Sequence, residues 1–176
     1  MQTKRICKNF FKRGVNMAVV TIIGAGMMGS ALAFPARENG NEVRLVGTHL
    51  DREIIETCRK TGRHPKFTKD FPDGVKYYHT EDMEAAIEGA DIIIGGVSSF
   101  GVDWFGDFVL PKIPENVPVI TVTKGLLDTE EGELLTYPEV WRRKLEKMGK
   151  KLSLNAIGAF LPSCSSSVML PFAWIK

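Results

Sequence analysis

This chain of 176 residues lacks several features that would assign it to a class of protein at once. It has only three cysteines, Cys7, Cys58 and Cys164, and they are scattered, with no C-x-x-C pair among them. Such usage favours reduced thiols in a cytoplasm and argues against metal ligation. No window holds the ~18 to 20 apolar residues of a membrane-spanning helix, so the sequence predicts no membrane span.

Patterns of metal ligands are missing as well. His49, His64 and His79 lie too far apart for a local metal motif, and we expect each of them to be a loop residue. The acidic run 128–133 is better interpreted as a solvated surface than as a cation site. The sequence therefore predicts no metal centre.

Acidic residues are absent from the first 16 positions, which carry five basic residues, whereas the rest of the chain has 18 basic and 21 acidic residues. A basic arm can bind nucleic acid or an anionic membrane surface. However, Met17 stands immediately before the first predicted strand, and the codons for residues 12–15 can resemble a bacterial ribosome-binding site. We therefore interpret residues 1–16 as a disordered extension or a mis-annotated start, and we predict no nucleic-acid partner.

What the sequence does contain is a glycine-rich turn between a strand and a helix. An apolar, β-branched run at 19–23, suited to a buried strand, leads directly into Gly24, Gly26 and Gly29, which form G-x-G-x-x-G. In a dinucleotide site such glycines permit a tight turn, let the backbone approach a pyrophosphate, and let the helix pack on the strand. The free N–H groups of the following helix then bind the pyrophosphate. The alternative is a strand–helix turn without a ligand.

Strands and helices alternate along the rest of the chain. Further strands are predicted at 42–46, 75–78, 91–95, 118–122 and 152–157, and further helices at 51–61, 80–87, 102–110 and 138–148. Asp51 and Thr80 are expected to cap the helices that they begin. The alternation predicts an α/β fold: a Rossmann-type doubly wound parallel sheet of six strands in a three-layer αβα arrangement.

Ligands of such sheets bind at the carboxyl ends of the strands. We expect Ser98 and Phe100, after the 91–95 strand, to face a bound nucleotide; the alternative for Phe100 is an ordinary core position. Lys124 follows the 118–122 strand, so its ammonium is placed to pair with a phosphate or to polarise a carbonyl. The alternative for Lys124 is a solvated surface lysine.

Five segments in order carry a resemblance to a known family: GAGMMGSALA, NEVRLVGTH, HPKF before FPDGVKY, IIIGGVSSF and TVTKGLLDTEEG. Together they resemble the cofactor domain of NAD(P)-dependent glycerol-3-phosphate dehydrogenase, over about residues 17–158. The T-K-G-L segment with acidic residues soon after it distinguishes this family from a generic Rossmann domain. The resemblance implies NAD or NADP as cofactor, and reversible hydride transfer between the nicotinamide and dihydroxyacetone phosphate, giving sn-glycerol 3-phosphate.

The resemblance also implies roles for single residues. Met27 and Met28 match the variable positions of the glycine turn that touch the cofactor, and Lys124 matches a lysine that contacts the substrate beside the nicotinamide. The candidate cofactor-binding residues are Gly24, Gly26, Met27, Met28, Gly29, Thr48, His49, Ser98, Phe100 and Lys124. Lys124 is also the candidate catalytic residue. The expected partner is a small-molecule substrate, and a homodimer is left open.

The chain departs from the family at two strand ends. Ser98 stands where the family usually has proline, and Val46 stands where it often has tryptophan. No acid stands at the end of the second strand, where an acid would favour NAD and a basic residue NADP. Thr48 and His49 stand there instead, and His49 is placed to approach a 2′-phosphate. The preference between NAD and NADP is therefore left open.

The last segment departs further, because the family continues with a large helical domain that carries the catalytic lysine. We interpret 17–158 as the dinucleotide-binding domain and 159–176 as a divergent tail. We expect a truncation, by a frameshift near Gly158, and therefore nucleotide binding with little or no turnover. General acid–base chemistry needs a proton donor within hydrogen-bond reach, and the rest of the chain offers no evident one.

Two other functions are compatible with a dinucleotide-binding domain of this kind. Another dehydrogenase with the same first domain, acting on a hydroxy acid or a hydroxyacyl thioester, would be expected to lack the T-K-G-L segment. A non-catalytic NAD(H)-sensing module would account for a missing catalytic half. It would, however, be expected to end in an ordered helix or a dimerisation element.

Overall fold

The computed structural model describes residues 17–130, 132–150 and 157–159, the last for the backbone alone. The predicted extension 1–16 and, apart from Ala159, the predicted tail lie outside these residues. Within the described ranges, no helix is both long enough and apolar enough to cross a bilayer.

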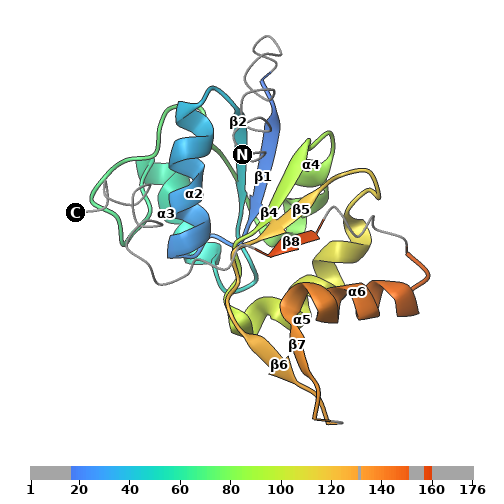
Figure 1. The fold of residues 1–176 in the computed structure, drawn as a ribbon. Coiled ribbons are helices and arrows are strands. Elements are labelled where there is room, and N and C mark those ends of the chain that lie inside the picture. The colour runs from blue at the N-terminus through green and yellow to red at the C-terminus, as the bar shows by residue number, and fades with distance from the viewer. Residues whose placement is uncertain (1–16, 131, 151–156, 160–176) are drawn as a thin grey trace, which may run out of the picture.

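Six strands of the described chain form one parallel sheet, in the order β3-β2-β1-β4-β5-β8 (Figure 1). Their bounds are β1 (Val19–Ile23), β2 (Glu42–Val46), β3 (Lys76–Tyr78), β4 (Ile92–Gly95), β5 (Val119–Thr121) and β8 (Ile157–Ala159). Strand β1 pairs with β2 on one side and with β4 on the other, so the chain reverses its direction of progress across the sheet at this point. This order confirms the predicted Rossmann-type doubly wound sheet.

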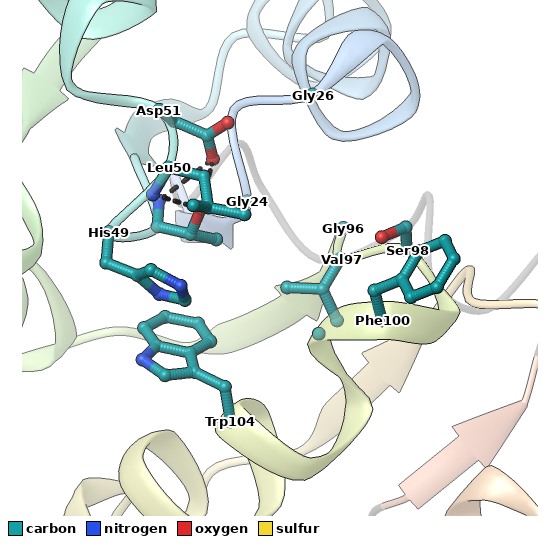
Figure 2. A pocket seen from close by; sticks show the side chains of 12 residues that line it. Gly24, Gly26, His49, Leu50, Asp51, Gly96, Val97, Ser98, Phe100 and Trp104 are labelled. Carbon is teal, nitrogen blue, oxygen red and sulfur yellow. Dashed lines mark hydrogen bonds between the residues drawn. The ribbon is translucent and has the colours of Figure 1, made fainter.

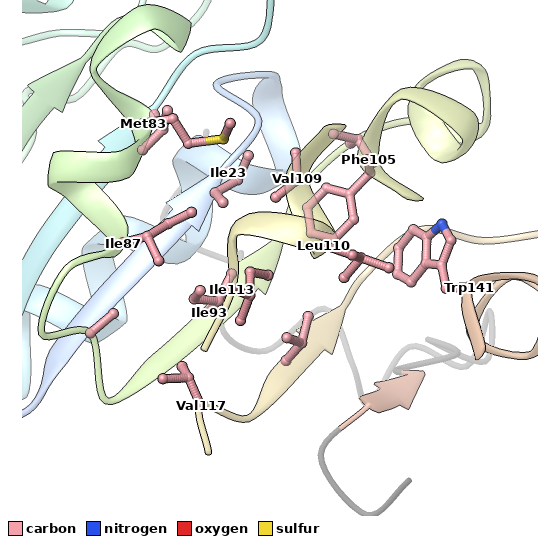
Figure 3. Close-up of a cluster of buried hydrophobic side chains, with 14 of the residues drawn as sticks. Ile23, Met83, Ile87, Ile93, Phe105, Val109, Leu110, Ile113, Val117 and Trp141 are labelled. Atoms are coloured by element: carbon pink, nitrogen blue, oxygen red, sulfur yellow. The ribbon is translucent and has the colours of Figure 1, made fainter. Parts of the chain in front are cut away.

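Helices cover both faces of the sheet (Figure 1). The α-helices are α2 (Met27–Glu38), α3 (Arg52–Thr61), α4 (Met83–Ile87), α5 (Val102–Trp104) and α6 (Tyr137–Lys147). Because successive side chains of a strand point to opposite faces, neighbouring residues of β1 enter different cores. Ile22 packs in the core that contains Ile55 of α3, whereas Ile23 packs in the core that contains Phe105 (Figure 3). The two cores confirm the three-layer αβα arrangement.

The segment predicted as one helix over 102–110 is helical, but it is composite and longer than predicted. The helical stretch consists of η2 (Ser99–Gly101), α5, a π-helical segment η3 (Phe105–Val109) and η4 (Leu110–Lys112). Pro111 has no N–H with which to continue an α-helical ladder, so the chain passes through it in the short 3-10 segment η4 instead. Trp141 of α6 stacks on Phe105 with ring centroids 4.7 Å apart and donates from Nε1 to the Val102 carbonyl oxygen at 2.9 Å. Helix α6 is thereby fixed against this segment.

Asp51 stands at the N-cap position of α3 as expected and Thr80 does not cap α4, and neither side chain forms a capping hydrogen bond. Asp51 does precede α3, but its side chain makes no cap bond and accepts hydrogen bonds from Ala25 and Thr48 instead. Thr80 lies in the short helix η1 (Thr80–Asp82), and its hydroxyl donates to the carbonyl oxygen of Gly47 at 2.8 Å. Asp51 thus accepts a bond from Ala25, 26 residues away, and Thr80 donates one to Gly47, 33 residues away, and neither side chain caps its own helix.

A hairpin that the sequence did not predict follows β5. Strands β6 (Leu126–Asp128) and β7 (Leu134–Thr136) pair antiparallel, and the acidic run lies around their turn. The strands read Leu-Leu-Asp and Leu-Leu-Thr, so the sequence has no alternation of apolar and polar residues that would signal the hairpin. Of the predicted strand 152–157, residues 152–156 lie outside the described chain, and β8 begins at Ile157.

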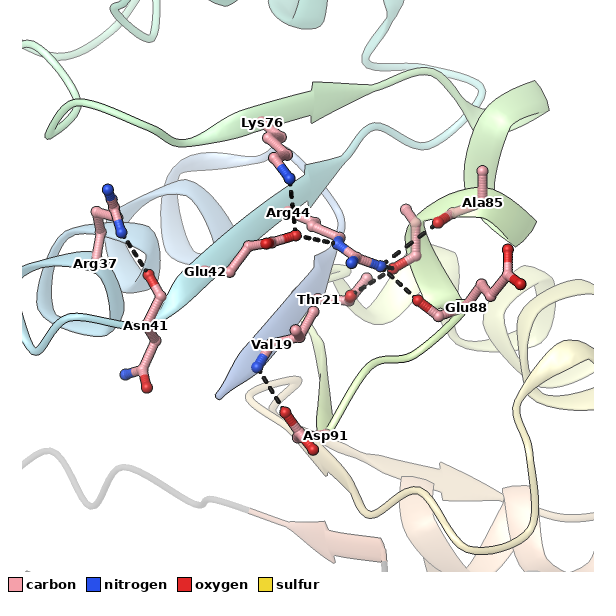
Figure 4. Close-up of polar contacts among 11 residues, drawn as sticks. Val19, Thr21, Arg37, Asn41, Glu42, Arg44, Lys76, Ala85, Glu88 and Asp91 are labelled. Atoms are coloured by element: carbon pink, nitrogen blue, oxygen red, sulfur yellow. Dashed lines mark hydrogen bonds and ion pairs between the residues drawn. The ribbon is translucent and has the colours of Figure 1, made fainter. Parts of the chain in front are cut away.

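Arg44 of β2 joins the sheet to the end of α4 (Figure 4). Its Nη1 donates to the carbonyl oxygens of Ala86 at 3.1 Å and Glu88 at 2.6 Å. Its Nε donates to the Glu42 carboxylate, which also accepts a bond from Lys76. These bonds to Arg44 and Lys76 lower the pKa of Glu42. The cations Arg44 of β2 and Lys76 of β3 thus share the Glu42 carboxylate, away from the ends of the strands that carry the glycine turn.

Removal of the Trp141 side chain tests the packing of α6. We expect Trp141→Ala to lower the free energy of unfolding by about 3–5 kcal/mol, because it leaves a cavity beside Phe105 and removes the bond to Val102. Urea unfolding followed by circular dichroism measures the loss. Glu146→Ala, an exposed position on the same helix, is the control and should change stability by less than about 0.5 kcal/mol. Equal losses in both variants would contradict this packing.

Candidate functional site

The glycine turn lies where β1 meets the ends of β2 and β4. Gly24 donates its N–H to Val46 at 2.8 Å, and Gly96 donates its N–H to Ile23 at 2.7 Å. Gly24 has a φ of 113°, a conformation that favours glycine. A Cβ atom at Gly24 would lie 2.8 Å from the Gly96 carbonyl carbon, and one at Gly96 would lie 2.7 Å from the Gly29 Cα. These three glycines are therefore required by the packing of the protein itself.

Gly26 differs from the three packing glycines. It precedes α2 with φ −64° and ψ 174°, a conformation open to any residue, and a Cβ atom there would meet nothing within 4 Å. Helix α2 has no side-chain cap at Gly26 and no acidic residue in its first turn. Open space thus lies before a helix N-terminus whose N–H groups carry partial positive charge, which is the arrangement that a pyrophosphate needs.

A pocket opens at this edge of the sheet (Figure 2). It is lined by Gly24, Gly26, Thr48, His49, Leu50, Asp51, Gly96, Val97, Ser98, Phe100, Gly101 and Trp104. The structure thus brings together six of the candidate residues: Gly24, Gly26, Thr48, His49, Ser98 and Phe100. Segments that follow three different strands converge here, as expected where the strand order reverses.

The remaining candidate residues lie outside the pocket lining. Met27 and Met28 are 56% and 41% exposed at the start of α2, whereas Gly29 is buried beneath the turn. Lys124 is exposed beyond the end of β5. Phe100 is 96% exposed at the edge of the pocket, so the alternative of a core position is wrong. Contact of these residues with a ligand stays a prediction.

Asp51 is a pocket residue that the sequence did not reveal as such. Its Oδ2 accepts bonds from the Thr48 N–H at 2.9 Å and the Thr48 hydroxyl at 2.8 Å (Figure 2). The same oxygen also accepts a bond from the Ala25 N–H at 3.1 Å. The carboxylate therefore ties the segment after β2 to the glycine turn. The spacing Thr48-x-x-Asp51 was the available signal, because hydroxyl and carboxylate side chains three residues apart can bond in a turn.

Trp104 is a second such residue. The His49 and Trp104 rings lie 5.7 Å apart between centroids (Figure 2). Trp104 also stacks on Phe108, with ring centroids 5.8 Å apart. Trp104 is only half-buried, and its ring offers an aromatic face beside the pocket. The imidazole of His49 forms no hydrogen bond with the described residues.

His64 lies in a loop as expected, but it is buried against the glycine turn rather than exposed. Its Nε2 is 3.2 Å from the Ala25 carbonyl oxygen, and its Nδ1 accepts a bond from the Lys66 N–H at 3.1 Å. Burial lowers the pKa of His64, although the bond to Ala25 acts in the opposite direction. Across the described chain, no three His, Cys, Asp or Glu side chains are grouped so that they could hold a metal ion.

The sequence of this chain is similar to those of glycerol-3-phosphate dehydrogenases. Residues 19–154 match the family model described as NAD-dependent glycerol-3-phosphate dehydrogenase N-terminus. An NADP(+)-dependent glycerol-3-phosphate dehydrogenase of Archaeoglobus fulgidus is 39% identical over 127 residues, which cover 72% of this chain and 37% of that protein. A glycerol-3-phosphate dehydrogenase (NAD(P)+) of Lactobacillus delbrueckii is 30% identical over 152 residues, which cover 86% of this chain and 43% of that protein. The chain therefore spans less than half the length of these relatives.

Solved structures are similar in fold. Glycerol-3-phosphate dehydrogenase of Coxiella burnetii superposes with a TM-score of 0.59 at 24% identity, over 76% of this chain and 38% of that chain. The Saccharomyces cerevisiae enzyme superposes with a TM-score of 0.63 at 16% identity, over 89% of this chain and 45% of that chain. At these identities the likeness concerns the fold alone.

Substitution of Gly29 and Gly26 separates the packing glycines from the open one. We expect Gly29→Ala to cost about 3 kcal/mol or more, because its Cβ would overlap the Gly24 carbonyl oxygen. We expect Gly26→Ser to change stability by less than about 0.5 kcal/mol, because the position is open and serine is a good N-cap residue. Thermal and urea unfolding measure both, and similar losses in the two variants would refute the distinction.

Proposed function

Because the chain belongs to the NAD-dependent glycerol-3-phosphate dehydrogenase family and contains its N-terminal NAD(P)-binding domain, we propose that it serves hydride transfer between NAD(P)H and dihydroxyacetone phosphate. The substrate and the reaction are proposed from this relationship, since the chain spans 37% of the Archaeoglobus relative. A cytoplasmic location is part of the proposal. It is supported by the scattered cysteines, of which Cys58 is free and buried, and burial raises the pKa of its thiol to about 11.

The observation that carries the proposal is the unfilled space at Gly26. Neither the backbone conformation nor the packing requires glycine there, whereas a dinucleotide pyrophosphate does require a bare backbone at this place. The N–H groups at the start of α2 would bind the pyrophosphate. When bound, the dinucleotide supplies or accepts the hydride, and the protein supplies binding and orientation.

The other residues divide into two groups by position. Thr48 and His49, at the end of β2, would hold the adenosine side of the dinucleotide, and Ser98 and Phe100 would line its path beyond β4. Lys124 leaves the sheet beside that path, because the neighbouring Thr123 hydroxyl donates to the Val97 carbonyl oxygen at 2.7 Å. Its ammonium would orient the ketone of the substrate and stabilise the developing oxyanion.

NADP is the preferred dinucleotide in this proposal. The acid nearest to the end of β2 is Asp51, whose Oδ2 already accepts three hydrogen bonds from the protein. His49 is the titratable side chain that remains without a hydrogen bond among the described pocket residues, and an imidazolium there would attract a 2′-phosphate. The Archaeoglobus relative is itself named as NADP(+)-dependent.

Titration with NAD+ and NADP+ tests the site at Gly26. We expect saturable binding to the unmodified chain, and at least a tenfold weaker affinity in Gly26→Ser, because its side chain occupies the space of the pyrophosphate. Quenching of tryptophan fluorescence or calorimetry measures the affinity. Asn39→Ser, at the other end of α2, is the matched control and should bind as the unmodified chain does. The proposal fails if the unmodified chain binds neither dinucleotide or if Gly26→Ser binds normally.

Substitution of His49 tests the preference for NADP. We expect His49→Asp to weaken NADP+ binding about tenfold or more relative to NAD+, because a carboxylate repels the 2′-phosphate and accepts bonds from the ribose hydroxyls. The measured quantity is the dissociation constant for NADP+ divided by that for NAD+, which should rise in His49→Asp. His49→Asn, which adds no charge, should raise this ratio less. An unchanged ratio in both variants would show that His49 does not face the 2′ position.

A further inference from the structure

His64 is held between two backbone groups beneath the glycine turn. It is 1% exposed, its Nε2 lies 3.2 Å from the Ala25 carbonyl oxygen, and its Nδ1 lies 3.1 Å from the Lys66 nitrogen. Phe67 covers the ring, with centroids 4.5 Å apart. A carbonyl requires a donor and an N–H requires an acceptor, so only the neutral imidazole with its proton on Nε2 satisfies both neighbours.

The Ala25 carbonyl that His64 contacts belongs to the glycine turn itself. This carbonyl oxygen also accepts a bond from the Ser30 hydroxyl at 3.0 Å. The N–H of Ala25, in the preceding peptide group, donates to Asp51. The peptide bonds of the described chain are trans, so the Ala25 carbonyl and the following Gly26 N–H point in opposite directions. A carbonyl held toward His64 therefore fixes the direction of the Gly26 N–H, which belongs to the pocket lining and has no partner among the described residues.

We propose that neutral His64 is a positioning residue of the dinucleotide site: it presets the Gly26 N–H for the pyrophosphate, and its protonation weakens dinucleotide binding. This inference rests on the proposed function. Protonation would place a second N–H on Nδ1, directly opposite the Lys66 N–H, and two donors cannot bond. The ring or the loop would then have to move, and the Ala25 carbonyl would lose one of its two donors.

The charged groups that face His64 define the direction of the effect. Lys66, on the same loop, disfavours the imidazolium, whereas Asp51, on the segment after β2, favours it. Burial is the largest influence and lowers the pKa of His64 below its ordinary value. The neutral form therefore predominates at and above about pH 6.5, and the preset turn is lost as the pH falls through the lowered pKa.

Titration with NAD+ between about pH 8 and pH 5.5 tests the inference, because NAD+ lacks the 2′-phosphate of NADP+, which itself titrates near this range. We expect the affinity of the unmodified chain to fall over this range by less than about tenfold, because a pKa below the ordinary 6.5 leaves about a tenth or more of His64 neutral at pH 5.5. His64→Leu should bind weakly at every pH. His64→Gln, whose amide can donate to Ala25 but does not titrate, should recover most of the affinity and give a flat profile. Circular dichroism at each pH identifies any variant that does not fold.

Two histidine variants serve as controls. His79 is hydrogen-bonded to the Glu56 carboxylate and lies outside the pocket lining, so His79→Gln should keep the profile of the unmodified chain. His49 lines the pocket, so His49→Gln must retain most of the pH dependence if His64 is its source. A flat profile in His49→Gln, or an unchanged profile in His64→Gln, overturns the inference.

Proton NMR of the His64 ring gives a readout independent of turnover. Because binding and protonation are linked, saturation with NAD+ should lower the pKa of His64 further. An unmoved pKa would overturn the inference. If the unmodified chain binds no dinucleotide at about pH 8, the proposed function fails together with this inference; binding with a flat profile contradicts the role of His64 alone.

Discussion

The close approach of three glycine backbones is the constraint on which the site depends. Gly24 and Gly29 belong to the turn and the helix after β1, and Gly96 follows β4. A Cβ atom at any of the three would overlap the backbone of another. Without side chains here, α2 can begin directly over the edge of the sheet at which β1 and β4 end. A larger residue at any of these positions would push the helix away from this edge.

Polar contacts from distant segments then hold the turn in one conformation. Asp51, after β2, binds the N–H of Ala25, and His64, in the loop before β3, contacts its carbonyl oxygen. Ser30 adds a bond from within α2. The turn therefore reaches its final geometry only when β2 and the loop are in place. A site assembled in this way is rigid before a ligand arrives, which reduces the entropy lost on binding.

Strands, helices and the glycine turn were predictable because their signals are local. The apolar run 19–23 and the run 42–46 became β1 and β2 with the expected bounds, since period and β-branching act over a few residues. The hairpin was missed because its two strands, Leu-Leu-Asp and Leu-Leu-Thr, do not alternate between apolar and polar residues. Asp51 was assigned to a helix cap because the sequence does not show that Ala25 lies closer to its carboxylate.

The sequence by itself determined the fold class, the family and the edge of the sheet at which a ligand would bind, since each depends on short-range patterns and on the chain order of strands and helices. Only the tertiary structure distinguished Gly26 from the packing glycines, placed Trp104 beside His49, and buried His64 against the turn. Those properties depend on contacts between residues tens of positions apart. Spacing along the chain carries no record of such contacts, because they form only when the strands pair and the helices pack on them.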